Sequence, residues 1–162
     1  MKGKNKKNNG FMMVETVVAT AIIVASMLAI MSVATKTITF SRQSFHATQA
    51  TFLLEEGAEA VRMNRDNSWT SNIANLTVGT NYCLYFNNTT WILQTSGCTS
   101  TGIFTRTVAV ANVNRNATTG DIATTGTLDV GTKLITVTVS WKEGGNTITK
   151  TLPFYISNIF ST

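Results

Sequence analysis

A single carboxylate, Glu15, lies within a long apolar segment and is the residue with the clearest chemical consequence. Residues 11–34 contain no other charged side chain. A carboxylate costs about 2.5 to 3.5 kcal/mol at the centre of a bilayer, and less near the end of a membrane helix, where it still needs a positive partner. Glu15 lies four residues after Phe11, which corresponds to about 6 Å along a helix. We therefore expect a positive charge close to Phe11 to neutralise Glu15.

Cleavage between Gly10 and Phe11 would create such a charge, because it leaves a free α-amino group on Phe11. Residues 1–10 read MKGKNKKNNG, with four lysines and no hydrophobic side chain after Met1. A segment of this composition cannot bury enough apolar surface to fold. We interpret it as a basic leader peptide.

The combination of Gly10, Phe11 and Glu15 with a basic leader and a long apolar helix resembles the N-terminal signal of type IV prepilins and type II secretion pseudopilins. In that family a prepilin peptidase in the membrane cleaves after the glycine and methylates the new N-terminal phenylalanine. The resemblance therefore implies leader cleavage between Gly10 and Phe11, N-methylation of Phe11, and a role for Glu15 in docking the subunit into a growing filament. It covers about residues 3–34, and Met12-Met13 replaces the family's usual Thr-Leu pair while keeping its apolar character.

Two other interpretations of the N-terminus remain open. An ordinary secretory signal peptide has the same basic-then-apolar order, but its apolar run is about 7 to 15 residues long. Here the run has twenty-four residues, and Val33-Ala34-Thr35 offers only a weak cleavage site after it. The second alternative is a membrane-anchored protein with an incidental Glu15, which would keep its leader.

The apolar segment is long enough to cross a membrane. As a helix, its twenty-four residues would extend roughly 36 Å at about 1.5 Å per residue, which exceeds the ~30 Å hydrocarbon core. The lysines of the leader should remain on the cytoplasmic side, and everything after Ala34 should lie outside. We expect a single-pass membrane protein with a cytoplasmic N-terminus and an extracytoplasmic C-terminal domain, which after assembly belongs to a periplasmic or cell-surface filament.

The helix is predicted to continue beyond the transmembrane half, residues 11–34, as an amphipathic half over residues 35–66. No proline occurs there, and apolar residues recur at helical spacing in two rows. Gly57 weakens the helix by up to about 1 kcal/mol relative to Ala and could allow a bend. The turn-forming residues 64–68 should end it at about Arg65. One row, stepping by seven, is Ile38, Phe45 and Phe52; the other, stepping by three or four, is Ala47, Ala50, Leu54, Ala58 and Val61.

Residues 67–162 are expected to form a β-rich globular domain. The whole chain is then α+β, with a long N-terminal helix packed on an antiparallel sheet in a pilin-like arrangement. Two hairpins are predicted from alternating apolar runs joined by turn formers. They pair residues 82–86 with 91–95, and residues 134–141 with 147–156.

The remaining strand signals complete the predicted sheet. Residues 103–113 should form another strand, and the Thr-, Gly- and Asn-rich residues 114–133 an exposed loop. Pro153 marks an edge strand or a bulge, because proline has no N–H for the ladder. One strand face, expected to cover the helix, carries Ile135, Val137, Val139 and Trp141.

Cys83 and Cys98 are the only cysteines, and both fall in the part predicted to be exported. A disulfide is the natural interpretation, and it would stabilise the fold by roughly 3 kcal/mol on a chain-entropy estimate. Two cysteines make a poor zinc site, and no Cys-x-x-Cys redox motif is present. Free buried thiols are the alternative.

The net charge of +5 does not indicate nucleic acid as a partner. Loss of residues 1–10 leaves nine basic residues against eight acidic ones, so the processed chain has little general affinity for phosphate. A phosphate-binding patch would require the remaining basic residues to converge in the fold. Those that could do so are Arg62, Arg65, Arg106, Arg115, Lys133, Lys142 and Lys150.

No catalytic or metal-binding group is predicted. The single His46 has no ligand partner at helical spacing and should be a surface or packing residue, and no nucleophile, base and orienting residue can be assembled. Glu59 is expected to pair with Arg62 on the helix surface, and Asp121 and Asp129 alone are too few for a calcium loop. We therefore expect no enzyme activity, no cofactor and no metal site.

The function that the resemblance implies is structural. We expect a pilin or pseudopilin, and more specifically a minor one, because the short chain and residues 53–62 look similar to that group. Its expected partners are other pilin subunits, the prepilin peptidase, the inner-membrane assembly machinery and the membrane. The alternatives are a minor pilin at the filament tip that binds a ligand or DNA, and a monomeric signal-anchored domain.

Overall fold

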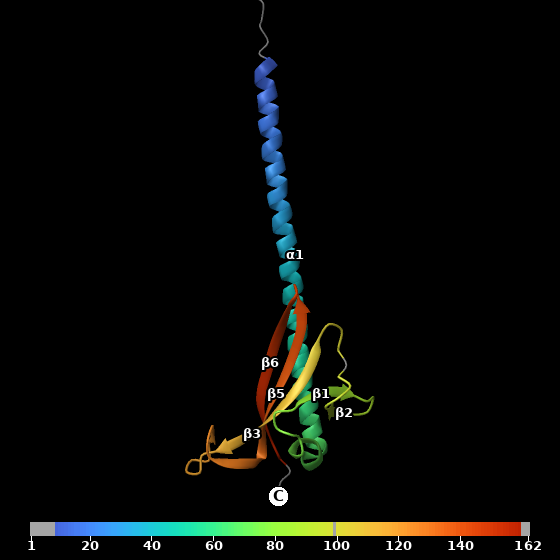
Figure 1. Cartoon of the computed structure of the whole chain (residues 1–162), viewed down its shortest axis with the longest axis vertical. Coiled ribbons are helices and arrows are strands. Elements are labelled where there is room, and N and C mark those ends of the chain that lie inside the picture. Colours follow the sequence, from blue (N-terminus) through green and yellow to red (C-terminus); the bar gives the residue numbers. More distant parts are fainter. Residues whose placement is uncertain (1–8, 99, 160–162) are drawn as a thin grey trace, which may run out of the picture. The chain divides into compact units, whose positions relative to one another are not determined.

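One long helix and a single antiparallel sheet make up the computed structural model (Figure 1). It describes residues 9–98 and 100–159, with side chains from Met12 onward. The predicted α+β class is confirmed. The elements are helix α1 (Asn9–Asn67), a π-helical turn (Thr70–Ala74), and strands β1 (Asn81–Phe86), β2 (Trp91–Gln94), β3 (Thr105–Arg115), β4 (Ile122–Ala123), β5 (Thr127–Glu143) and β6 (Asn146–Ser157).

The chain divides into two compact units, Met1–Phe45 and His46–Thr162. Helix α1 runs through the boundary, so the second unit contains the last turns of α1 together with the whole sheet. The prediction of one continuous helix from Phe11 to about Arg65 is confirmed. The second unit is called the globular unit below.

The helix ends where the turn-forming residues occur. Asn64 is buried, and its side-chain amide donates a hydrogen bond to the carbonyl of Ala60 at 2.9 Å. The backbone carbonyl of Asn64 accepts a hydrogen bond from the side chain of Asn72 at 3.0 Å. These bonds use carbonyl groups that lie near the unpaired end of the helix. From here the chain turns toward β1 through Trp69 and Ile73, which are both buried.

The strands follow the order β2-β1-β3-β5-β6, and β4 pairs with the end of β3. Both predicted hairpins are confirmed: β1 and β2 pair Phe86 with Trp91, and β5 and β6 pair Glu143 with Asn146. Gly144 and Gly145 form the second turn with φ angles of 57° and 85°. Glycine adopts this backbone region without strain, which explains why both turn residues are glycines.

Two further strand predictions are confirmed. The strand expected at residues 103–113 is β3, shifted by two residues. Pro153 lies on β6, which is an edge strand that pairs only with β5. An edge strand tolerates proline because one of its sides has no partner strand.

The core of the globular unit forms between α1 and one face of the sheet. The predicted face of β5 is buried there, and Ile135, Val137 and Val139 are inaccessible to solvent. Each such side chain contributes about 1.5 to 3 kcal/mol on burial, so this contact dominates the stability of the unit. The buried cluster includes Ala50, Leu54 and Val61 of α1, Ile135, Val137, Val139 and Trp141 of β5, and Phe104, Val108, Val110 and Ile156 from the neighbouring chain segments.

The sheet covers only one of the two apolar rows that the helix carries. Ile38, Phe45 and Phe52 are 61%, 60% and 66% exposed. Helical spacing alone did not decide which row would be buried. The covered row is rich in alanine, and small side chains let the helix backbone approach a sheet closely.

Gly57 marks such a close approach. A Cβ atom added to Gly57 would lie 2.8 Å from Cγ1 of Val137 and 3.3 Å from Cδ of Arg106. The absent side chain therefore serves the packing of α1 on β3 and β5. The bend that the sequence suggested is not needed to explain this glycine.

The prediction of an exposed loop over residues 114–133 was wrong in part. β3 continues to Arg115, β4 forms within the segment, and β5 begins at Thr127. The register between β3 and β5 shifts after Asn112, so that β5 carries extra residues around Val130, which is 74% exposed. This segment forms strands although it is rich in Thr and Gly, because its residues pair with those of a neighbouring strand.

Asp129 ties the start of β5 to the end of β3. Its carboxylate oxygen Oδ2 lies 2.6 Å from Nε of Arg115. The hydrogen bond from Arg115 is the main cause that lowers the pKa of Asp129, and bonds from Thr132 and Gly131 add to it. Because the folded-state pKa is lowered, the carboxylate contributes stability above the unfolded pKa of about 3.9, and this contribution is lost as the pH falls through the lowered pKa.

Gly57→Ala should lower the free energy of unfolding by about 1 kcal/mol, although alanine favours helix, because the added methyl group overlaps a stiff Val137 side chain. Chemical denaturation of the full chain, followed by circular dichroism, measures this change. Glu55→Ala, at an exposed position of the same helix, is the control and should change stability by less than about 0.5 kcal/mol. An increase in stability on Gly57→Ala would contradict the packing role.

Candidate membrane and assembly segment

Residues 12–34 present an apolar surface that the described chain does not cover. The large hydrophobic side chains from Met12 to Val33 are all more than half exposed, from 51% at Val18 to 73% at Met13. A soluble monomer rarely exposes so extensive an apolar surface. This part of the chain is long and apolar enough to cross a membrane, as the sequence predicted. The direction of crossing stays a prediction.

The hydroxyl groups of this segment are satisfied by the helix itself. Thr20 Oγ1 donates a hydrogen bond to the carbonyl of Thr16 at 2.9 Å, and Ser26 Oγ donates to the carbonyl of Ile22 at 2.8 Å. A hydroxyl that bonds one turn back along its own helix no longer requires water, so it can lie in hydrocarbon. The same bonding occurs at Thr16, Ser32, Thr35, Thr37 and Thr39.

Glu15 is the exception among the polar side chains of the segment. Its side chain is exposed, and it forms no ion pair within residues 9–98 and 100–159. The next basic residue along the helix is Lys36, twenty-one residues further on, which is roughly 30 Å away at the rise of an α-helix. Within the described residues, the chain therefore places no cation close to Glu15, and its docking role stays a prediction.

The predicted processing site lies at the edge of what the structure describes. Gly10 and Phe11 belong to the first turn of α1, but the side chain of Phe11 and the leader residues 1–8 lie outside the described residues. Cleavage after Gly10 and methylation of Phe11 therefore stay predictions.

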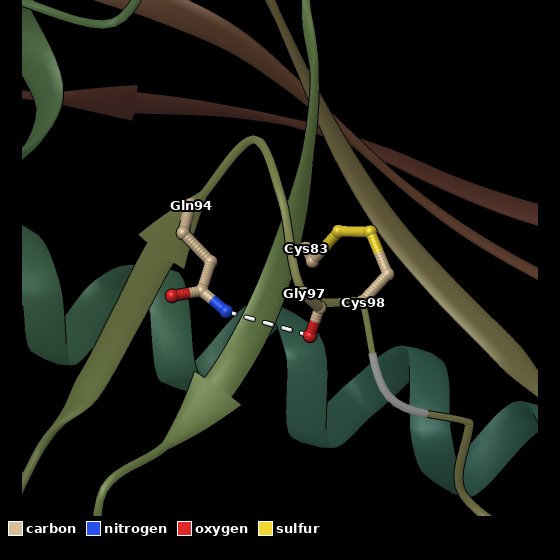
Figure 2. The surroundings of a disulfide bond; sticks show 4 residues. All are labelled: Cys83, Gln94, Gly97 and Cys98. Carbon is tan, nitrogen blue, oxygen red and sulfur yellow. Dashed lines mark hydrogen bonds between the residues drawn. A yellow bond between two sulfur atoms is a disulfide. The ribbon is translucent and has the colours of Figure 1, made fainter.

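Cys83 of β1 and Cys98 form the predicted disulfide (Figure 2). Cys83 is 3% exposed, and the two Cα atoms are 5.1 Å apart. The bond fastens the segment that follows β2 back onto β1. In the same segment, Nε2 of Gln94 donates a hydrogen bond to the carbonyl of Gly97 at 3.5 Å.

The sequence left open whether seven basic side chains come together in one patch. In the fold, most of them form separate contacts. The predicted Glu59–Arg62 ion pair is confirmed. Four of the seven basic residues are paired with a carboxylate, and the expectation that nucleic acid is not a partner stays a prediction. The other pairs are Arg65 with Asp66 at 2.8 Å, Arg106 with Glu56 at 2.6 Å and Arg115 with Asp129 at 2.6 Å, while Lys133 donates to Asn112 and Lys150 to the carbonyl of Ala47.

Sequence reasoning missed a contact between the helix and the distant β5–β6 hairpin. Nδ1 of His46 lies 3.5 Å from Oε1 of Glu143, and the His46 ring packs edge to face on Phe104 at 6.2 Å. A search at helical spacing cannot find a partner on another element, so only the fold brings this pair together. The expectation that His46 is a surface or packing residue is confirmed.

Comparisons of the chain with protein-family models, with curated proteins and with solved structures found no match. The long N-terminal apolar helix and the disulfide-containing antiparallel sheet are compatible with a pilin-like fold. The function is therefore inferred from the residues and their geometry.

Replacing both cysteines, Cys83→Ala with Cys98→Ala, should lower the free energy of unfolding by about 3 kcal/mol, because the unfolded chain is no longer cross-linked. Chemical denaturation of the full chain measures the difference. A reducing agent should destabilise the unchanged protein by a similar amount and leave the double variant unaffected. Equal stability of the double variant and the unchanged protein without reducing agent would show that the bond contributes nothing.

Proposed function

We propose that the protein is a structural subunit of a type IV pilus or a type II secretion-like filament, more specifically a minor pilin or pseudopilin, processed after Gly10. The observation that carries the proposal is Glu15, a carboxylate on an uncovered apolar helix with no ion-pair partner among the described residues. Processing supplies the α-amino group of Phe11, which pairs with Glu15 of the same or a neighbouring subunit. The partners are other pilin subunits, the prepilin peptidase, the inner-membrane assembly machinery and the membrane.

The uncovered row of α1 supports helix packing between subunits. The step of seven through Ile38, Phe45 and Phe52 extends back into the apolar segment through Met31, Val24 and Val17, all more than half exposed. A repeat of seven residues is the pattern by which parallel helices supercoil around one another. Helices that share one membrane and one orientation are parallel, so the row suits packing of α1 on copies of itself.

The globular unit also carries an apolar cleft beside the helix. Next to Phe52, a cleft of about 480 Å³ is lined by Leu53 and Phe104 together with the exposed side chain of Ile103. Apolar side chains exposed side by side favour contact with another protein. The cleft is therefore a second apolar surface that a neighbouring subunit could contact.

Removal of the leader is the first test. Mass spectrometry of the chain coexpressed with a prepilin peptidase should show a protein that begins at methylated Phe11. Gly10→Leu should block cleavage, because the peptidase of the family cleaves after glycine, and Gly3→Leu, at the other glycine of the leader, should be processed normally. A native chain that begins at Met1 would overturn the proposal.

Glu15→Ala should leave membrane insertion intact and reduce assembly. Insertion becomes easier because a charge is removed from the apolar segment. Incorporation into filaments in competition with the unchanged subunit should fall about tenfold or more, since a lost charge pair of only about 1.4 kcal/mol gives that factor. Thr16→Ala, which removes a neighbouring hydroxyl, is the control and should incorporate normally. Equal incorporation of Glu15→Ala would refute the docking role.

A further inference from the structure

A second cleft in the globular unit lies between the C-terminal end of α1 and the tip of the β1–β2 hairpin. Its volume is about 300 Å³, at the lower end of the usual range for small-ligand sites. Neither the membrane segment nor the uncovered row of α1 contributes to it. Its walls carry two aromatic rings, one thioether and several neutral or acidic polar groups. These lining residues are Met63, Asp66 and Asn67 from α1, and Phe86, Thr89, Thr90 and Trp91 from the hairpin.

The aromatic wall is formed by Phe86 and Trp91. They are paired directly across the hairpin, and their ring centroids are 5.2 Å apart at an interplanar angle of 50°. Phe86 is 46% exposed, and Trp91 is half-buried. Two adjoining rings of this kind provide an apolar surface for a flat ligand.

Trp91 is held in place before any ligand arrives. The guanidinium carbon of Arg106 lies 5.2 Å from the centre of the Trp91 ring. Arg106 is itself fixed, because its side chain is 9% exposed, pairs with Glu56 at 2.6 Å and donates to the carbonyl of Leu53 at 3.1 Å. A side chain that is already ordered loses little freedom on binding, which favours affinity.

The loop that adjoins the rings is also ordered. Oδ1 of Asn87 accepts hydrogen bonds from the backbone N–H groups of Thr89 and Thr90 at 3.1 and 2.8 Å. The N–H of Asn87 donates to the carbonyl of Thr90 at 3.1 Å, and Asn88 adopts a φ of 69°. This turn orders Thr89 and Thr90, which both line the cleft, and the Thr90 hydroxyl donates to the carbonyl of Trp91 at 3.5 Å.

The charges around the cleft are balanced. Asp66 accepts a hydrogen bond from Nε of Arg65 at 2.8 Å, and Glu56 neutralises Arg106. A ligand cation would compete with Arg106 for the Trp91 ring, and a ligand anion would meet Asp66. The site therefore favours a neutral ligand that has one apolar face and several hydroxyl groups.

We propose that this cleft binds a neutral sugar, with the C–H face of one pyranose ring against Phe86 and Trp91 and its hydroxyls bonded to Asp66, Asn67 and the threonines. An ionised carboxylate and a side-chain amide are strong acceptors and donors for sugar hydroxyls. The binding site lies wholly in the globular unit, so it does not depend on leader cleavage or on filament assembly. It adds a recognition function to the structural one.

Saturation-transfer difference NMR on the full chain tests the proposal. The protein is kept in a polyacrylate amphipol, because common sugar-headed detergents would occupy the site. The probes are cellobiose, lactose and diacetylchitobiose, each at millimolar concentration, with choline as the cationic alternative. At least one disaccharide should receive saturation, strongest at the protons on one face of the ring, while choline receives none.

Variants locate the binding. Phe86→Ala should weaken it about tenfold, because one of the two rings is lost, and Asp66→Ala, at an exposed position, should weaken it without touching the aromatic wall. Trp91→Phe keeps a ring and should retain binding. Tyr155→Ala removes an exposed aromatic side chain from β6 and is the matched control, with binding unchanged.

Three results would overturn the proposal. The first is the absence of transfer to every disaccharide. The second is binding by Phe86→Ala and by Asp66→Ala that is as strong as binding by the unchanged protein, since the sugar would then lie elsewhere. The third is transfer to choline alone, which would make the cleft a cation site.

Discussion

The globular unit depends on the contact between the alanine-rich row of α1 and the valine row of β5. Ala50, Leu54 and Val61 lie against a sheet face that includes Val137 and Val139. A sheet can cover only one side of a helix, so this contact also determines which side chains of α1 remain uncovered. The large residues of the opposite row, Phe52 among them, are left for water or for another protein. The helix face that the sheet buries therefore determines both the core of the unit and the side chains of α1 that stay exposed.

Local signals sufficed for the long helix and for both hairpins, and tertiary contacts decided the rest. The helix from Phe11 and both hairpins follow from periodicity and from turn residues such as Gly144-Gly145, which act over a few positions. The strands within residues 114–133 were missed because their order comes from pairing across β3 and β5, where Arg115 meets Asp129. The aromatic cleft was missed for the same reason, since Asp66 and Trp91 come together only in the fold.

Arg106 and Glu15 differ in whether the described chain supplies a partner of opposite charge. Arg106 is nearly buried, and the chain supplies Glu56 and a helix carbonyl to neutralise it. A buried charge without such a partner would cost several kcal/mol, about 3 to 5 where one partner of a pair is removed. Glu15 would also face a cost in hydrocarbon, smaller near the end of the helix than at the bilayer centre, yet within the described residues no cation is placed beside it. Within the described residues, Glu15 is thus a carboxylate of the apolar segment for which the chain offers no cation.

A shallow sugar site gains strength when it is displayed on a filament. One cleft of about 300 Å³ contacts about one sugar ring, and a contact of that size binds weakly because association costs much of what it gains. If the proposed filament carried two or more copies of the subunit, each later binding event would become an intramolecular one, and avidity could exceed single-site affinity by about 10² to 10⁴. The cleft is fixed within the globular unit, to α1 at Asp66 and Asn67 and to the hairpin at Phe86 and Trp91. Weak individual sites on an ordered support would bind a repetitive glycan surface reversibly, whereas a single detached subunit would not remain on it.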